Sequence, residues 1–197
     1  MKQAPGSSSI PARSAHAMMQ DWNVVITVFQ GGFKRAVRAL RELGRVERSA
    51  YHNVLVMAVE TPVDLIDAIE RRSADDPALY DAISRIAPAY RCFDFKTAQE
   101  FCERAKEIAL EWLPRLASQT FHVRVHGRGL GRYLHTQDAE RIIDDTLLAA
   151  LEKEGVPGAV SFVEPDAVIA IDSIDHRAGM ALWTRDDLKR HPLLRPD

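Results

Sequence analysis

Cysteine is scarce in this sequence. Among the 197 residues only Cys92 and Cys102 are cysteines. Two cysteines cannot form a disulfide scaffold or an all-cysteine zinc site, and their spacing matches no paired metal-ligand motif. We therefore expect a protein of the reducing cytoplasm that holds no metal.

Long hydrophobic runs and an excess of one charge are also absent. No apolar stretch approaches the roughly 20 residues of a membrane helix, and residues 1–20 lack the apolar core of a secretory signal. We interpret residues 1–20 as a disordered tail and expect no contact with a membrane. The formal net charge of -2 excludes a basic field over the whole molecule, and with it indiscriminate nucleic-acid binding. DNA is not an expected partner, and any polyanion site must be a local patch.

Residues 21–95 show the element order of a ferredoxin-like domain. The segment WNVVITVF is rich in β-branched and aromatic residues and is followed by Gly31 and Gly32, which predicts a strand and a turn. Similar patterns predict strands at 22–29, 46–49, 54–59 and 86–93 and helices at 33–43 and 61–73. The resulting βαββαβ order is typical of two helices on one face of a four-stranded antiparallel sheet.

Residues 96–197 predict a second, α/β domain. The segment FHVRVHG alternates apolar and polar residues, as a half-buried strand does. Thr97 and Thr136 are placed to cap helices. We expect helices at 97–114, 136–154 and 186–190 and strands at 121–127, 167–171 and 180–184. The expected fold class is therefore α+β, a ferredoxin-like domain followed by an α/β domain.

The most basic uninterrupted segment runs from Ser118 to His135. Arg124, Arg128 and Arg132 lie in it without an acidic residue, and glycines alternate with them. Glycine lets a backbone approach a ligand closely, and guanidinium groups fit phosphate in a bidentate manner. The segment fits a phosphate-binding loop or, equally, a solvated surface turn.

Other interpretations of this region remain open. Arg124 to Gly129 fits the Arg-x-x-Gly-x-Gly pattern of the coenzyme A loop of GNAT acetyltransferases, so a small acyltransferase that binds acetyl-CoA is an alternative. A protein-interaction module that binds no RNA is another. His122 and His126 share one strand face, but no spacing supports a zinc site. The acidic residues near the C-terminus are interpreted as caps and turns rather than catalytic groups: Asp172, Asp175, Asp186 and Asp187.

Charge is segregated along the chain. A basic stripe precedes position 46, whereas the helix expected at 136–154 is acidic. The stripe is either a solvated face or an RNA contact, and the sequence leaves that open; it consists of Lys34, Arg35, Arg38, Arg41 and Arg45. Opposite charges in separate segments suit a protein that presents one surface to a polyanion.

Four sequence blocks resemble a THUMP domain, an RNA-binding module of tRNA-modifying enzymes. They are TFHVRVHGRG, QDAERIIDDTLLAALEKEG, PDAVIAIDSID and GMALWTRDDL, in the order that such domains show. The βαββαβ segment is similar to the ferredoxin-like domain that accompanies THUMP. This resemblance covers nearly all of the chain after residue 20.

The resemblance implies that the protein binds the acceptor stem and 3′ end of tRNA. It further implies a stand-alone adaptor that is no enzyme, needs no cofactor and presents tRNA to a separate modifying enzyme, as the adaptor of a cytidine acetyltransferase does. The RNA-binding residues that it implies are Arg124, His126, Arg128, Arg132, Arg185, Lys189 and Lys96. Phe93 and Phe95, beside Lys96, would stack on a splayed 3′ end or, alternatively, fill an interdomain core.

Overall fold

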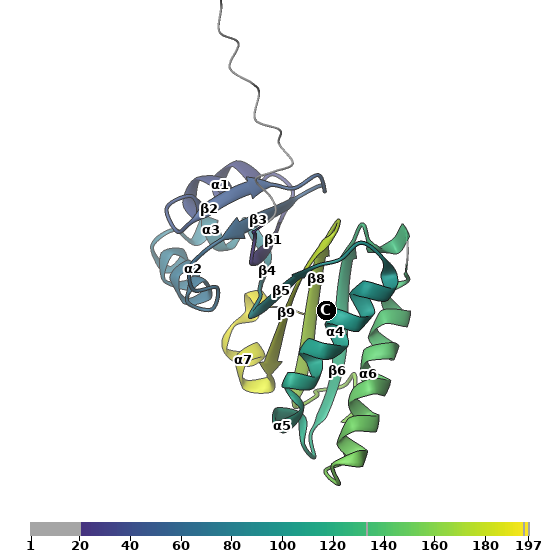
Figure 1. The fold of residues 1–197 in the computed structure, drawn as a ribbon. Helices are drawn as coiled ribbons and strands as arrows, with labels where there is room; N and C mark the ends of the chain where they lie inside the picture. The colour runs from purple at the N-terminus through teal and green to yellow at the C-terminus, as the bar shows by residue number, and fades with distance from the viewer. Residues whose placement is uncertain (1–20, 133, 195, 197) are drawn as a thin grey trace, which may run out of the picture.

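Two β-sheets, each covered by helices on one face, make up the molecule (Figure 1). The structure is a computed structural model that describes residues 21–132, 134–194 and 196. The tail expected at 1–20 lies outside the described residues. The two sheets with their helices confirm the α+β class. Every described helix is too short or too polar to cross a bilayer.

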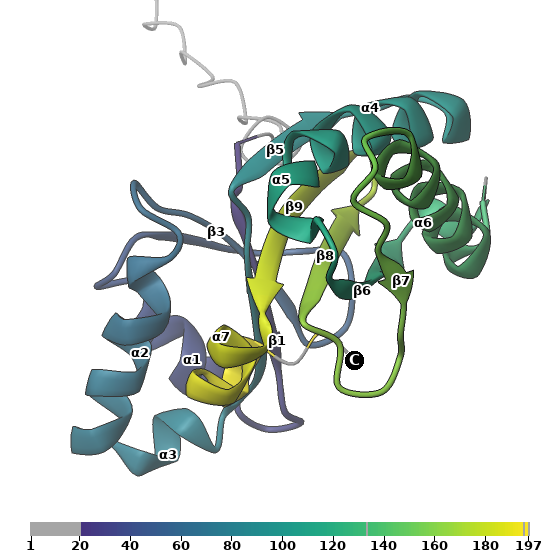
Figure 2. The ribbon, with the colours of Figure 1, turned by 90° about the horizontal axis from the view of Figure 1, so that it is seen from below.

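The four-stranded sheet is antiparallel and has the order β2-β3-β1-β4, as the ferredoxin-like pattern predicts. Helices α1 and α2 cover one of its faces, where Ile26, Leu40 and Ile69 are fully buried (Figure 2). The elements are β1 (Val24–Val28), α1 (Phe33–Leu40), β2 (Arg45–Arg48), β3 (Val54–Ala58), α2 (Asp64–Asp75), α3 (Pro77–Tyr80) and β4 (Ile83–Pro88).

The five-stranded sheet has the order β5-β9-β8-β6-β7, and β6 pairs in parallel with β8 and β7. Helices α4 and α6 cover one face, where Phe101, Val123 and Ile143 are buried. The elements are β5 (Arg91–Asp94), α4 (Ala98–Glu111), α5 (Leu113–Leu116), β6 (Thr120–Arg128), η1 (Leu130–Arg132), α6 (Thr136–Lys153), β7 (Ala159–Val160), β8 (Ala167–Ile174), β9 (Arg177–Thr184), α7 (Arg185–Arg190) and η2 (Pro192–Leu194).

The single strand expected at 86–93 is two strands in different sheets. Strand β4 pairs with β1, whereas β5 pairs with β9, and the amide of Tyr90 between them already donates to the carbonyl of Met180. Residues 86–93 are mostly apolar without a clear break, so their composition did not indicate that the chain passes from one sheet to the other. The division at 95/96 stays a prediction, and we propose to place the domain boundary between Pro88 and Arg91.

The C-terminal segment returns to the first domain. Leu193 is 1% exposed and belongs to the hydrophobic core under α1 and α2. Leu194 packs against Ile66 of α2 and against Trp183 of β9. His191 Nδ1 lies 3.1 Å from both carboxylate oxygens of Glu70 in α2. Residues 191–194 therefore fasten the second domain to the first.

Helix α6 runs along the part of the β6 edge that the two-residue strand β7 leaves open. The amides of Val123 and Val125 point away from β8, and they donate to Asp144 Oδ1 at 3.1 Å and to Glu140 Oε1 at 2.8 Å. Residues four apart on a helix lie on one face, so both carboxylates reach amides two apart on the strand. Two of the acidic residues of this helix thus complete the backbone hydrogen bonds of the sheet.

Burial gives Asp144 an unusual acidity. Loss of water around its side chain raises the pKa to about 7, although the amide of Val123 acts in the opposite direction. The unfolded chain ionises near the ordinary value of 3.8. Between these two values the unfolded state releases a proton that the folded state keeps, so this group makes the fold less stable as pH rises and its effect levels off above about 7.

We expect Asp144→Asn to remove this pH dependence. Asparagine keeps an oxygen for the Val123 amide but cannot ionise. The free energy of unfolding of the variant should exceed that of the wild type at pH 8 by up to about 4 kcal/mol, and the difference should shrink toward pH 4. Urea denaturation of both proteins from pH 4 to pH 8 measures it. Parallel pH profiles of the two proteins would contradict the assignment.

Candidate nucleic-acid interface

Asp172 lies at the centre of the contact between the two domains. It sits in the middle of β8, is 3% exposed, and faces away from α4 and α6 toward the first sheet. Arg85 of β4, which is also buried, donates from Nη1 and Nη2 to the two carboxylate oxygens at 2.7 Å each. Burial alone would raise the pKa of Asp172, but Arg85 outweighs it and lowers that pKa. The expectation that Asp172 is a cap or turn residue is wrong, because it lies in a strand and binds Arg85.

Arg128 and His126, two of the expected RNA-binding residues, join this buried cluster. Arg128 Nη1 lies 3.4 Å from Asp172 Oδ1, and Nη2 donates to Thr27 Oγ1 of β1 at 3.2 Å. His126 Nε2 lies 2.7 Å from the carbonyl of Pro196, and because a carbonyl only accepts, this nitrogen carries the hydrogen. Burial and the nearby Arg85 lower the pKa of His126. The imidazole is therefore neutral near pH 7, and Arg128 is engaged between the domains.

Gly129 serves domain packing. Its φ is +90°, and an added Cβ would lie 2.7 Å from Tyr51 Oη, so a side chain is excluded on two grounds. Tyr51, in the turn between β2 and β3, donates from Oη to Asp175 Oδ1 at 2.7 Å. The close approach expected between this glycine and a ligand is thus made with the first domain.

Arg124 projects from the same face of β6 as His126 and remains partly exposed. Its Nη1 lies 3.8 Å from Glu140 Oε1. The segment Arg124 to Arg128 is strand, so it is no loop, and its backbone pairs with β8. The amide of Val125 is occupied by Glu140 as well. A phosphate cradle of backbone amides, which the acyltransferase alternative requires, is therefore not available in this segment.

Arg185 organises the loop between β7 and β8. Its Nε donates to the carbonyl of Pro165 at 3.1 Å, its Nη2 donates to the carbonyl of Glu164, and it forms an ion pair with Asp166 at 2.9 Å. Glu164 has a φ of 45°, which a non-glycine residue adopts only with support. Arg185 supplies that support.

Lys96 and Lys189 are exposed, at opposite ends of the second sheet. Lys96 follows β5, whose end pairs with the start of β9, whereas Lys189 lies on α7, which follows the end of β9. The eight residues of β9 correspond to about 25 Å. Arg132 ends η1, and its side chain lies outside the described residues. The expected RNA-binding residues therefore do not form one patch, and their contact with RNA stays a prediction.

Phe93 and Phe95 are buried. They are 9% and 2% exposed, and Phe95 meets the ring of Phe101 at a centroid distance of 5.1 Å. Their core is that of the second domain alone, beneath α4. The alternative that they stack on RNA is wrong, because their faces are covered by other rings, and the interdomain core expected for them lies within one domain.

The described residues contain one trio with spacing suited to a metal ion, Asp67, Glu70 and His191, whose ligand atoms lie within 4.8 Å of one another. Both ring nitrogens of His191 face a carboxylate: Nδ1 lies 3.1 Å from Glu70 Oε2, and Nε2 lies 4.0 Å from Asp67 Oδ1. This trio binds the C-terminal segment to α2 through His191.

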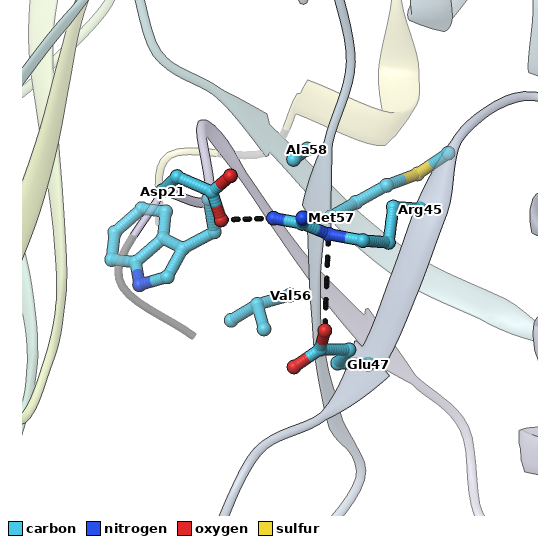
Figure 3. Close-up of a pocket in the computed structure, with 7 residues that line it drawn as sticks. Asp21, Arg45, Glu47, Val56, Met57 and Ala58 are labelled. Carbon is cyan, nitrogen blue, oxygen red and sulfur yellow. Dashed lines mark hydrogen bonds and ion pairs between the residues drawn. The ribbon is translucent and has the colours of Figure 1, made fainter. Parts of the chain in front are cut away.

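Arg45, the last member of the basic stripe, is neutralised. Figure 3 shows its guanidinium between Asp21, with which it forms an ion pair and a hydrogen bond, and Glu47 at 3.8 Å. It lies on β2 rather than on α1. Arg48, on the same strand, lies over the ring of Phe33 at 4.1 Å.

No protein-family model and no curated protein sequence matches the chain. Several solved structures do. PH1313 from Pyrococcus horikoshii has a TM-score of 0.57 with 13% identity over 82% of this chain and 54% of its own. A 4-thiouridine synthetase in complex with RNA and ATP has a TM-score of 0.52 with 13% identity over 82% and 41%. A possible methylase from Clostridium difficile has a TM-score of 0.51 with 14% identity over 82% and 40%.

These similarities support a THUMP-like fold for the chain. They cover between 40% and 54% of the similar chains, so this chain spans about half their length. The THUMP-like fold expected from the four sequence blocks is confirmed, at a sequence identity of 13–14%.

The expectation that the chain is no enzyme is contradicted. Structures with this fold include a synthetase and a possible methylase, so the fold recurs in chains named for catalysis. The expectation came from the resemblance to a stand-alone THUMP adaptor, and the similar structures do not support that part of the resemblance.

The Asp172 cluster makes a clear prediction about stability. Asp172→Asn should lower the free energy of unfolding by about 3 to 5 kcal/mol, because it leaves the buried guanidinium of Arg85 without a counter-charge. The double variant Arg85→Met with Asp172→Leu should lose much less, because both charges are gone. Urea denaturation of the wild type, of Arg85→Met, of Asp172→Leu and of the double variant gives the coupling energy. Additive losses in the double variant would show that the two residues do not interact as described.

Proposed function

We propose that this protein takes part in RNA modification and holds the RNA substrate in that reaction. The observation that carries the proposal is the likeness, over 82% of the chain, to a 4-thiouridine synthetase whose structure was solved in complex with RNA. The THUMP-like sequence blocks support the same conclusion. Within this proposal tRNA is the substrate class, held at its acceptor stem and 3′ end by the two domains together.

The electrostatics of the chain favour recognition of shape and phosphates. Some carboxylates that could repel RNA are engaged in structure: Asp172 and Asp166 bind guanidinium groups, and Glu140 binds a strand amide. Exposed cations such as Lys96 and Lys189 remain at the surface. Contacts of this kind are insensitive to sequence and weaken with salt.

The contacts between the two domains fix the positions of the surface cations relative to one another. The buried pair at Asp172 and the more exposed hydrogen bond from Tyr51 to Asp175 join the two sheets, and residues 191–194 connect them at a third place. Cations on both domains are therefore held at set separations. A rigid spacing of charges suits a folded RNA better than a flexible strand.

Binding of a fluorescently labelled tRNA transcript should be salt-dependent. The plot of log K against log salt should fall with a slope of roughly 0.7 to 0.9 per neutralised phosphate. Lys189→Gln should reduce the slope by about 1, whereas Lys153→Gln, an exposed cation on α6, should leave it unchanged. Fluorescence anisotropy measures the affinities. Failure of the wild-type protein to bind tRNA, or an affinity that does not change with salt, would refute the proposed function.

A further inference from the structure

The outer face of α1 concentrates positive charge that forms no direct ion pair with another described residue, although Arg35 and Arg38 line a groove together with Glu42, Asp75 and Asp76. Its exposed cations are Lys34, Arg35 and Arg38, and the C-cap residue Arg41, also exposed, continues the same face. Within the described part of the chain none of the four has a carboxylate within ion-pair distance. The nearest acid in sequence, Glu42, is held by Arg72 at 2.5 Å. The neighbouring Arg45 and Arg48 are engaged, as described above, so in this part of the first domain the cations without a direct partner among the described residues are those from Lys34 to Arg41.

This arrangement is unfavourable for the helix by itself. Lys34 and Arg38 are four residues apart, and Arg38 and Arg41 three apart, so like charges lie side by side. Lys34 and Arg35 also occupy the first turn, where the helix dipole is positive, and no acidic residue balances them there. Gly32, at the N-cap, provides no side-chain hydrogen bond. Bound anions would relieve both the mutual repulsion and the conflict with the dipole.

The place of α1 in the fold makes this face accessible. The helix packs through Ala36 and Leu40 onto the side of the first sheet that faces away from the second domain (Figures 1 and 2). Its N-terminus follows β1 by four residues, and β1 carries Thr27, which accepts a hydrogen bond from Arg128. The basic face therefore begins near the place where Arg128, the last residue of β6, contacts the first domain.

The chemistry of the face indicates phosphate rather than bases. The only aromatic residue of α1 is Phe33, and Arg48 covers its ring. Helix α1 itself therefore offers no free aromatic ring for stacking, which single-stranded bases would require. From Lys34 to Arg41 the helix rises by about 10 Å, enough to meet two or three successive phosphates.

We propose that the exposed face of α1 binds the phosphate backbone of the RNA substrate as a second contact surface, separate from the second domain. This inference rests on the proposed function. The first domain then contributes to affinity directly, and the RNA must extend beyond the part held by the second domain.

The test is a triple variant, Lys34→Gln with Arg38→Gln and Arg41→Gln. Glutamine is a good helix former, so α1 should persist, and removal of like-charge contacts should leave the melting temperature equal or higher. The slope of log K against log salt for the tRNA transcript should fall by about 2 to 3, and Kd at 0.1 M salt should rise by about tenfold or more.

A matched control removes three cations from the opposite side of the molecule. Arg104→Gln on α4 with Arg141→Gln and Lys153→Gln on α6 changes the net charge by the same amount as the α1 variant does. It should leave the slope nearly unchanged. Acylation of the Lys34 amine by an N-hydroxysuccinimide ester, followed by mass spectrometry, should slow when tRNA is bound, while acylation of Lys153 should not.

The outcomes separate this inference from the proposed function. If the wild-type protein binds tRNA and the α1 variant binds it with the same slope, the α1 surface is refuted and the proposed function stands. An equal loss in the control variant would also refute it, because net charge would then explain the effect. If the wild type does not bind tRNA, the proposed function itself fails.

Discussion

The ion pair between Arg85 and Asp172 determines how the two domains are joined. Each residue lies in the middle of a strand in its own sheet, and neither has access to bulk water. Two charges in such a place are tolerated only if they meet with good geometry, so the pair permits one register of the domains and penalises others. Arg128, His126 and the turn at Tyr51 take their positions around it.

The distribution of carboxylates explains how a chain of nearly balanced charge can present a basic surface. Asp144 and Glu140 bind strand amides, Asp172 binds Arg85, and Asp166 binds the loop guanidinium of Arg185. Cations, by contrast, are left outside on α1. Because these four carboxylates are engaged in structure while the cations of α1 stay at the surface, the net charge of -2 does not describe the field near α1.

Local patterns in the sequence were sufficient for most elements and insufficient for the site. Periodicity and capping residues predicted the βαββαβ order and the long helices, because these depend on neighbours within a few residues. Arg85 and Asp172 are 87 positions apart, so nothing local pairs them, although a lone carboxylate inside AVIAIDSI was a visible signal. The arginines of β6 were identified as phosphate ligands for the same reason: their partners, Asp172 and Glu140, lie far along the chain.

The return of Leu193 to the first core has a consequence for the order of events during synthesis. The first domain needs a residue that is translated after the whole second domain, so its core cannot be completed as soon as its own strands have left the ribosome. The contacts concerned join distant parts of the chain, which slows folding. Assembly of the two domains is therefore a single late event, and the nascent first domain exposes an unfilled apolar site until it occurs.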